Sequence, residues 1–192
     1  DGKYKGGPII GRGHFVPPDV VYPDLETGQS EKSVVHFTVG AVGLDIEVDP
    51  GTGEVVVNKA VAGYDVGKAI SLLNVKCQIE GGTIQGLSAG LFEGIYYDKN
   101  GKLLTPDFTD YKIATTMDVP WEIESFCEET PEDPSPYGNR GVGEHSMISP
   151  AAALGNALYK AIGIRIHQYP FTRERVYMAI KAAERGEKDF WG

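Results

Sequence analysis

The strongest constraint on the fold is an alternating segment that runs into a tight turn. Residues 44–49 read L-D-I-E-V-D, which places apolar and acidic side chains on opposite faces of an extended chain. The turn sequence D-P-G-T-G-E follows at 49–54, and the β-rich run V-V-V-N-K-A-V-A-G occupies 55–63. We therefore expect an antiparallel hairpin in this region, so a sheet is the first element of the fold.

A helix with regularly spaced glycines is expected after the hairpin. A short helical stretch follows residue 67, and a longer helix is predicted over about 78–96, with Gly82, Gly86 and Gly90 four residues apart. A glycine in a solvated helix costs about 1 kcal/mol relative to alanine, so another group must approach this backbone closely. The two candidates are a neighbouring strand and a bulky planar ligand.

The rest of the chain completes an α+β pattern. A turn is expected at 98–101, a strand from Val119, and a proline-rich loop over 128–140. Ser149 and Pro150 are typical of a helix start, and Gly163 of the end of that helix. Thr172 is expected to cap a last helix over 173–185.

The predicted organisation is an extended N-terminal arm followed by one larger unit. Residues 1–32 contain G-G-P, P-P and Y-P-D but little apolar periodicity, so we expect an arm that lies on a neighbour. Residues 33–192 are expected to form an antiparallel or mixed sheet packed against helices. The chain begins with Asp and without a signal segment, which suggests a piece of a longer protein.

Charge and cysteine content exclude several classes of function. The 18 basic and 27 acidic residues give a net charge of −9, which argues against nucleic acid as a partner. Cys77 and Cys127 lack CxxC spacing, so neither a disulfide framework nor a structural zinc site is expected, and a reducing cytoplasm fits best. No apolar run approaches the roughly 20 residues needed to cross a bilayer, so we expect a soluble protein without membrane insertion.

The segment G-V-G-E-H-S-M-I-S-P at 141–150 contains the best candidate for chemistry, Glu144. Glycines at 141 and 143 allow close approach of the backbone to a ligand, and the following helix start restricts where the carboxylate points. If this side chain is shielded from water, its pKa rises and it becomes a usable base near neutral pH. The alternative is a glutamate on a solvated surface that only interacts with the helix dipole.

Several runs together resemble one enzyme family. They are Y-D-V-G-K-A-I at 64–70, Q-I-E-G-G-T-I-Q-G-L at 78–87, D-Y-K-I at 110–113, G-V-G-E at 141–144 and P-F-T-R-E-R-V at 170–176. In this order and spacing they resemble the C-terminal part of the molybdopterin-binding large subunit of the xanthine oxidase and aldehyde oxidoreductase family of molybdenum hydroxylases. The resemblance covers roughly residues 33–180 and implies the molybdenum-cofactor-binding fold of that family, incomplete without preceding domains.

The resemblance implies a site and a reaction. Glu144 corresponds to the catalytic base, which stands beside the molybdenum without ligating it, and no metal-ligating residue is expected. Gln78 corresponds to a glutamine that hydrogen-bonds the pterin, and the backbone of Gly141, Val142 and Gly143 is expected to face the cofactor. The reaction implied is oxidation of a heterocycle or aldehyde C–H with oxygen from water.

The implied cofactors and partners extend beyond this chain. The molybdenum–molybdopterin is expected in its cytosine dinucleotide form, with [2Fe-2S] clusters and FAD on partner domains or subunits. Substrate-contacting residues of the family lie in preceding sequence, so we expect the isolated chain to be inactive. The alternative is a non-catalytic module of the same fold that binds the cofactor or assembles subunits. In a purely structural interpretation, packing alone explains the glycine-rich helix.

The sequence departs from the family pattern at three places. His145 stands where many relatives have proline, and it is expected to be a satisfied surface or core histidine, with lining of a substrate channel as the alternative. Cys77 replaces a common glycine and is expected to be a small buried residue and not a ligand. Residues 70–72 read I-S-L in place of I-N-P. For Gln78 the alternative is an ordinary residue at a helix start.

Overall fold

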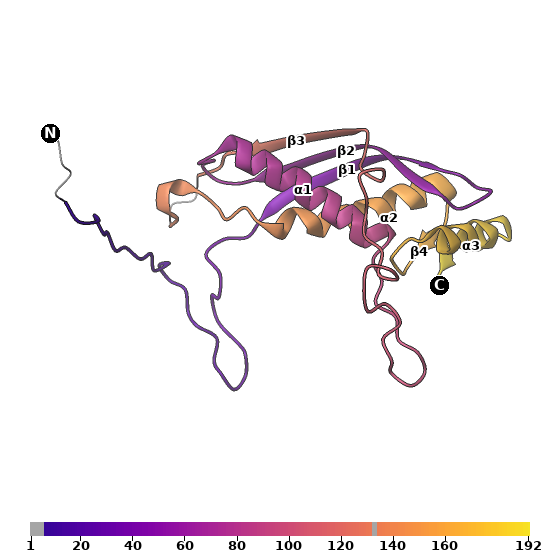
Figure 1. The fold of residues 1–192 in the computed structure, drawn as a ribbon, viewed down its shortest axis with the longest axis horizontal. Coiled ribbons are helices and arrows are strands. Elements are labelled where there is room, and N and C mark those ends of the chain that lie inside the picture. The colour runs from indigo at the N-terminus through magenta and orange to yellow at the C-terminus, as the bar shows by residue number, and fades with distance from the viewer. Residues whose placement is uncertain (1–5, 132–133) are drawn as a thin grey trace.

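The computed structural model describes residues 6–131 and 134–192, and its main sheet has three strands. Strands β1 (Val39–Val48) and β2 (Val55–Asp65) are antiparallel, and β3 (Glu122–Glu128) pairs in parallel with β2. The sheet is therefore mixed and lies against helices in an α+β arrangement, as predicted (Figure 1). A second, two-stranded sheet that we did not predict joins β4 (Arg165–Ile166) and β5 (Asp189–Phe190).

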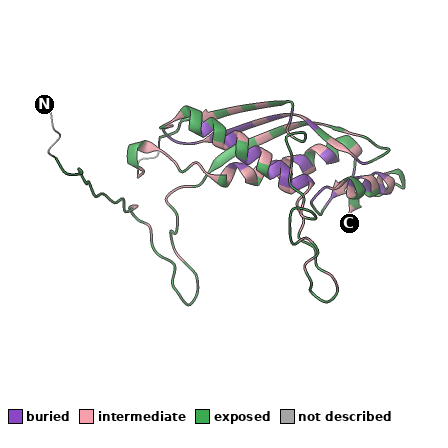
Figure 2. Ribbon diagram, in the orientation of Figure 1, coloured by how far each residue is buried: buried purple, intermediate pink, exposed green. Residues whose placement is uncertain are grey.

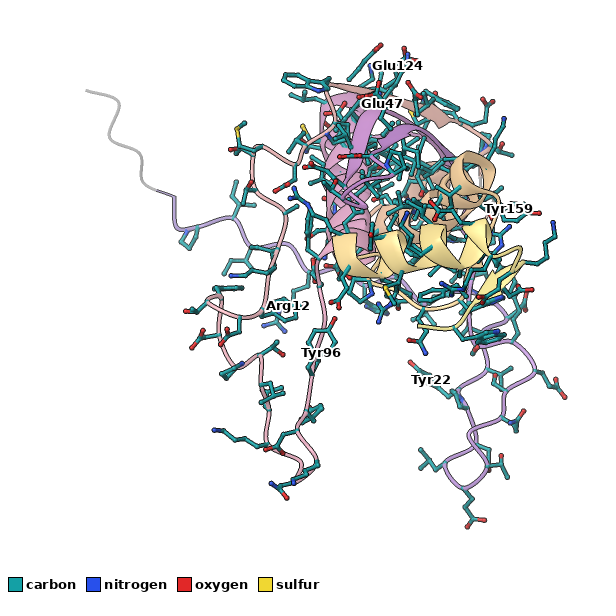
Figure 3. All side chains as sticks on the ribbon, turned by 90° about the vertical axis from the view of Figure 1, so that its right-hand side faces the viewer. Arg12, Tyr22, Glu47, Tyr96, Glu124 and Tyr159 are labelled. Carbon is teal, nitrogen blue, oxygen red and sulfur yellow. The ribbon has the colours of Figure 1, made fainter. Side chains whose placement is uncertain are left out.

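The predicted hairpin is confirmed. The Asp49 carboxylate accepts hydrogen bonds from the Gly51 N–H and the Thr52 hydroxyl, both at 2.8 Å, which closes the turn. On the outer face of the sheet, Lys59 forms ion pairs with Glu122 and Glu124 of β3. Figure 3 labels two acidic side chains on these strands, Glu47 of β1 and Glu124 of β3, so the alternating pattern separates a charged face from the face that covers the core.

Helix α1 (Leu72–Leu91) is one continuous helix that begins earlier than predicted. Its N-cap is Ser71, whose side chain accepts a hydrogen bond from the Asn74 N–H. The predicted start at Gln78 and the separate short stretch before it are wrong, because no glycine or proline interrupts the run after the Ser71 cap. Gln78 therefore lies in the second turn of the helix and not at its start.

The helix after the G-V-G-E segment also begins without the predicted cap. The 3₁₀ helix η2 (Glu144–Met147) runs directly into α2 (Ile148–Ile162), so Met147 occupies the cap position and makes no side-chain cap. Ser149 and Pro150 lie inside the first turn of α2. The predicted end of this helix is confirmed, because Gly163 follows α2 in the left-handed conformation with φ 75°. The predicted start of the last helix is also confirmed, because Thr172 caps α3 (Arg173–Glu184).

The glycines of α1 face the following helix, and not the strand or ligand that we considered. A Cβ at Gly82 would lie 1.9 Å from the Ser146 Oγ, and one at Gly86 would lie 2.4 Å from the Met147 carbonyl oxygen. A Cβ at Gly90 would meet Ala151 at 3.4 Å. The glycine stripe thus lets η2 and α2 pack closely along α1.

Two apolar clusters lie between the helices and the sheet, where Figure 2 shows most of the buried residues. The larger cluster joins α1, α2 and α3 with the turn end of the hairpin, and its main members are Val57, Leu87, Leu91, Leu154, Leu158, Ile164, Ile166, Phe171, Val176, Ala179, Ile180 and Ala182. The smaller cluster lies at the other end of the sheet and contains Ala62, Tyr64, Val66, Val75 and Ile79. The smaller cluster supports the candidate site described below.

Two long segments project away from this body (Figures 1 and 3). Residues 6–38 contain no helix or strand and are mostly exposed, whereas residues 1–5 of the predicted arm lie outside the described chain. The segment between α1 and β3 contains the predicted turn, with Gly101 at φ 81°. Near residue 137, the short 3₁₀ helix η1 (Pro136–Gly138) precedes the G-V-G-E segment. In the described part of the chain, no helix is long and apolar enough to cross a membrane.

Candidate functional site

Residues from two distant parts of the sequence meet at the start of η2. The Gln78 side chain projects from the second turn of α1, and its Nε2 donates a hydrogen bond to the Gly143 carbonyl oxygen at 3.2 Å. Two turns further along the same face of α1, the Gln85 Nε2 donates to Glu144 Oε1 at 3.3 Å. Gln78, Gly143 and Glu144, which the family resemblance assigns to one site, thus lie together.

Glu144 is exposed in this chain, which corrects the expectation that its carboxylate is held away from water. The physical reason is the orientation of η2 on α1. Ser146 is the residue of η2 that is fully buried in the packed interface, whereas Glu144 stays exposed although Gln85 of α1 reaches its carboxylate. Packing of η2 on α1 therefore buries Ser146 and leaves Glu144 open to solvent in the described chain.

The turn that carries Glu144 is fixed from beneath by buried polar groups. The Ser146 Oγ donates to the Gln78 carbonyl oxygen at 3.0 Å, and the Tyr64 hydroxyl donates to the Ser146 carbonyl oxygen at 3.3 Å. Tyr64 itself is 3% exposed in the smaller cluster. Helix α1, strand β2 and η2 are therefore connected directly below the candidate base.

His145 points inward from the same turn. Its Nδ1 accepts a hydrogen bond from the Gly143 N–H at 3.3 Å, and its ring stands at 70° to the Tyr64 ring with centroids 5.0 Å apart. Burial lowers the pKa of His145 below its ordinary value of 6.5. Its Nε2 is buried and has no hydrogen-bond partner within the described residues, so the expectation of a fully satisfied histidine is wrong.

A cavity of about 350 Å³ lies beside this turn, at the N-terminal end of α1. Three of the predicted cofactor-contacting residues, Gln78, Gly141 and Val142, line it, whereas Gly143 and Glu144 do not. The other lining residues are Val66, Lys68, Ala69, Ile70, Ser71, Asn74, Val75, Asn139 and Arg140. The cavity thus joins the β2–α1 loop to the segment that precedes Glu144.

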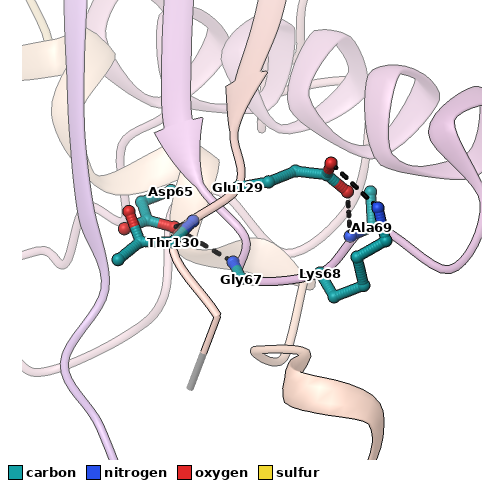
Figure 4. Close-up of polar contacts among 6 residues, drawn as sticks. All are labelled: Asp65, Gly67, Lys68, Ala69, Glu129 and Thr130. Atoms are coloured by element: carbon teal, nitrogen blue, oxygen red, sulfur yellow. Dashed lines mark hydrogen bonds and ion pairs between the residues drawn. The ribbon is translucent and has the colours of Figure 1, made fainter. Parts of the chain in front are cut away.

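The loop between β2 and α1, which forms one wall of the cavity, is held by two carboxylates (Figure 4). Asp65 Oδ1 accepts from the Gly67 N–H at 3.0 Å and from the Thr130 N–H at 3.2 Å. Burial raises the pKa of Asp65, but these donors and the charge of Arg140, 3.6 Å away, outweigh it and hold the pKa below 3.8. Asp65 is therefore a charged anchor for the loop.

Glu129 is the second anchor. It accepts from the Ala69 N–H at 2.6 Å and from the Lys68 Nζ at 3.1 Å, and these donors lower the pKa of its carboxyl. Both anchoring carboxylates point at backbone N–H groups of the loop, Asp65 at Gly67 and Glu129 at Ala69 (Figure 4). The loop can then present its other face to a ligand without rearranging.

The segment before Glu144 is paired with the same loop. The Lys68 N–H donates to the Gly138 carbonyl oxygen at 2.7 Å, and the Arg140 N–H donates to the Val66 carbonyl oxygen at 2.8 Å. Gly67 has φ 59°, and a Cβ there would lie 2.5 Å from the Gly138 oxygen. The close pairing of these two segments therefore requires glycine at position 67.

The donors around the cavity favour a ligand that is rich in hydrogen-bond acceptors. Lys68 and Arg140, each already paired with a carboxylate, bring cationic groups to the lining, and Asn74, Gln78 and Asn139 bring amides. Among the described residues, no group of three or more His, Cys, Asp or Glu side chains is arranged to hold a metal ion directly. Cys77 is exposed and does not line the cavity, so the expectation that it fills a buried gap is wrong.

A larger cavity of about 710 Å³ lies at the other end of α1. It is bounded by β2, the end of α1, the segment before β3 and the start of α3, and none of the predicted site residues lines it. Of the predicted site residues, Gln78, Gly141 and Val142 thus line the smaller cavity. Sequence reasoning missed Gln85, which hydrogen-bonds Glu144, although its spacing of seven from Gln78 places both residues on one helix face.

Taken together, the fold and site define a class of protein: an α+β domain in which the end of a hairpin, a glycine-striped helix and the loop between them form a cavity beside one carboxylate. The family model described as "Molybdopterin cofactor-binding domain" matches residues 2–120, more than half of the chain. The chain belongs to this molybdopterin cofactor-binding domain family. The match includes Gln78 and ends before Glu144.

Relatives extend the similarity across the candidate site. The chain is 41% identical over 165 residues to the nicotine 6-hydroxylase large subunit of Paenarthrobacter nicotinovorans, covering 83% of this chain and 20% of that protein. It is 34% identical over 166 residues to a putative xanthine dehydrogenase molybdenum-binding subunit of Escherichia coli, covering 83% of this chain and 22% of that protein. The chain thus spans about one fifth of the length of these relatives.

Solved structures show the same fold. Quinoline 2-oxidoreductase from Pseudomonas putida 86 superposes with a TM-score of 0.67 at 36% identity, over 71% of this chain and 18% of that one. Aldehyde oxidoreductase from Desulfovibrio gigas gives a TM-score of 0.71 at 29% identity, over 77% of this chain and 16% of that one. The fold is therefore that of the molybdenum-cofactor-binding region of the xanthine oxidase family.

Proposed function

We propose that this chain supplies the catalytic base, Glu144, and part of the cofactor-binding surface of a molybdenum hydroxylase. The observation that carries the proposal is the pair of hydrogen bonds from Gln78 and Gln85 on one face of α1. They reach the Gly143 carbonyl at 3.2 Å and the Glu144 carboxylate at 3.3 Å, so the carboxylate is aimed from a rigid helix. Rigid support of this kind is what a positioned proton acceptor requires.

The cavity beside Glu144 fits an acceptor-rich cofactor such as molybdopterin. Lys68 and Arg140 suit a phosphate, the Gln78 amide suits a pterin heteroatom, and the backbone at Gly141 and Val142 can approach the ligand closely. When bound, the cofactor supplies a two-electron oxidation in which oxygen from water enters a substrate C–H bond. The proposed form is the cytosine dinucleotide.

The proposed role of Glu144 is to accept a proton at a carboxylate oxygen during that oxygen transfer. A base of this kind works best when its pKa is near the operating pH, which requires shielding from water. Because Glu144 is exposed in this chain, we propose that the remaining part of the molybdenum subunit covers it. Gln85 then fixes one carboxylate oxygen and leaves the other available for the proton.

The proposed substrate is an aromatic nitrogen heterocycle or an aldehyde. Relatives named for nicotine and quinoline support the heterocycle, and one named for aldehydes supports the second class. The proposed partners are the rest of the molybdenum subunit and domains or subunits that carry [2Fe-2S] clusters and FAD. A relative named as one subunit of a dehydrogenase complex supports such an assembly, and we propose a cytoplasmic location for it.

The test is Glu144→Gln in the complete enzyme, which removes the proton acceptor and preserves the shape of the side chain. We expect kcat to fall by a factor of about 10² to 10⁴ with molybdenum content unchanged. Glu187→Gln is the matched control, because that glutamate pairs with Arg185 after α3 and touches none of the site residues. A Glu144→Gln enzyme that keeps the wild-type kcat would refute the assignment.

The alternative function is a non-catalytic module of the same fold that binds the cofactor or assembles subunits. The exposure of Glu144 in this chain is the observation that favours it. The same variant separates the two functions, since a scaffold needs no carboxylate at this position. Full turnover by the Glu144→Gln complex, with normal assembly, would support the module.

A further inference from the structure

The backbone of the Gly143–Glu144 turn depends on the side chain that follows it. The Gly143 N–H points at His145 Nδ1, 3.3 Å away, and forms the hydrogen bond that closes the turn on this side. On the other side, the Gly143 carbonyl oxygen accepts from Gln78. The peptide groups of Gly143, which orient Glu144, are therefore held on both sides, by the His145 ring as acceptor and by the Gln78 amide as donor.

This hydrogen bond fixes the form of the imidazole. An N–H donor at Nδ1 requires that Nδ1 carry no proton, so the proton of the neutral ring is on Nε2. Burial lowers the pKa of His145, which keeps the ring neutral and Nδ1 available as an acceptor. A protonated ring would present a donor to the Gly143 N–H and lose the contact.

The ring is held in place by the sheet. Tyr64 contacts it edge to face with centroids 5.0 Å apart, and the Tyr64 hydroxyl reaches the Ser146 carbonyl oxygen on the next residue. Strand β1 makes room for this tyrosine, because a Cβ at Gly40 would lie 2.0 Å from its ring. The imidazole therefore rests on a side chain that cannot move without disturbing β1 and β2.

From these contacts we infer that His145 is a positioning residue that aims Glu144 through the backbone of Gly143, with Tyr64 as its support. Neighbouring residues on a short turn cannot both face one small site, and here Glu144 faces outward while His145 faces the core. His145 thus acts on the reaction without touching it. This inference rests on the proposed function, since it assumes that Glu144 is the base.

The test compares variants of the complete, cofactor-loaded enzyme at position 145. They differ in where the side chain places a hydrogen-bond acceptor for the Gly143 N–H. Asn carries its oxygen on Cγ, as histidine carries Nδ1, whereas Gln carries its oxygen one bond further out. Phe keeps the ring and removes the acceptor. Turnover is expressed per bound molybdenum, and KM, melting temperature and molybdenum content are measured beside it.

We expect His145→Asn to keep kcat within about threefold, and His145→Gln and His145→Phe to lose about 10- to 100-fold, because a small misplacement of a catalytic group has effects of this size. KM should change less than about threefold in all three, since substrate contacts are untouched. Rescue by Asn, with a loss confined to kcat, is a pattern that a role in packing alone would not produce.

Two results would overturn the inference. One is wild-type kcat in both the Phe and Gln variants, and the other is an equal loss in Asn and Phe, which would assign the effect to ring packing. Glu144→Gln, measured in parallel, separates this failure from failure of the proposed function. If Glu144→Gln is inactive while the His145 variants are normal, only the inference fails; if Glu144→Gln is active, both fail.

Discussion

The part of α1 up to Gln85, which we call its polar half, and the last turns after Gln85, which we call its apolar half, are held by different kinds of contact. The polar half packs Val75 and Ile79 into the smaller apolar cluster. It also makes hydrogen bonds from Gln78 to the Gly143 carbonyl and from Gln85 to the Glu144 carboxylate, and the Gln78 carbonyl accepts one from Ser146. The apolar half packs Leu87 and Leu91 into the larger cluster with α2 and α3.

The two kinds of contact affect different properties, namely the stability of the packing and the orientation of Glu144. Burial of apolar surface is non-directional and fixes how closely elements pack, whereas a hydrogen bond fixes the angle between two groups. The apolar half of α1 therefore supplies most of the packing free energy, and the polar half sets the orientation of the turn that carries Glu144. Substitutions in the two halves should have separable effects on local stability and on turnover.

The largest expected loss of stability comes from removing a side chain that packs against the apolar half of α1. Leu154 is fully buried against the apolar half of α1, so Leu154→Ala should lower the local opening free energy of α1 and α2 by about 2–5 kcal/mol. Hydrogen–deuterium exchange of peptides from α1 and α2 in the complete enzyme measures this loss. Turnover per folded, molybdenum-loaded enzyme should stay near wild type.

Two outcomes for Leu154→Ala would contradict the division of α1 into an apolar half and a polar half. A Leu154→Ala enzyme with normal exchange protection would show that the larger cluster does not hold the helices. A large drop in kcat per bound molybdenum would show that the two halves are not separable.

A smaller stability effect with a larger effect on turnover is expected in the polar half. A Cβ at Gly82 would lie 1.9 Å from the Ser146 Oγ and 2.9 Å from its Cβ, so rotation of the hydroxyl alone cannot relieve the clash. Gly82→Ala should cost about 1–3 kcal/mol of local stability and displace η2. It should lower kcat through the bond from Ser146 to Gln78.

Gly81→Ala is the matched control, since it makes the same chemical change one residue earlier. A Cβ at Gly81 meets nothing within 4 Å, so alanine should stabilise the helix by roughly 0.5–1 kcal/mol. Opposite signs for the two variants in hydrogen exchange, with kcat lowered only in Gly82→Ala, are expected. Equal effects would mean that intrinsic helix propensity, and not contact with η2, governs this region.

The sequence predicted the elements whose signals are local. The hairpin turn at Asp49 and the helix cap at Thr172 form within a few residues, so their patterns could be recognised without knowledge of the fold. The helix end at Gly163 is of the same kind. The start of α1 was missed because the Ser71 cap signal is weak beside the glycines that begin at Gly81.

The contacts of the site could be predicted only in part, because they join residues distant in sequence. Gln78 and Gly143 were chosen from motifs, but the bond between them, over 65 positions, comes from packing of η2 on α1. The burial of His145 and the exposure of Cys77 depend on which face of each element meets a neighbour. No pattern within a few residues contains that information.

The smallest expected effect is a pH dependence in the polar half. Burial lowers the pKa of His145 below 6.5, so the folded state favours the neutral ring. The stability that the neutral His145 ring contributes is fully present when the pH is above the pKa of the unfolded state. This stability is lost as the pH falls below 6.5 toward the pKa of the folded state, because the unfolded state binds the proton more readily. Protonation would also remove the acceptor for the Gly143 N–H.

His145→Asn isolates this effect, since asparagine keeps an acceptor and does not titrate in this range. The wild-type enzyme should lose exchange protection around η2 relative to His145→Asn between pH 7.5 and pH 5.5, after correction for intrinsic exchange rates. The α2 and α3 peptides of the larger cluster should show no such difference, because the Gly143 contact does not reach them. An identical pH response of the two enzymes at η2 would mean that the imidazole is not neutralised by folding, and that Gln78 alone holds the turn.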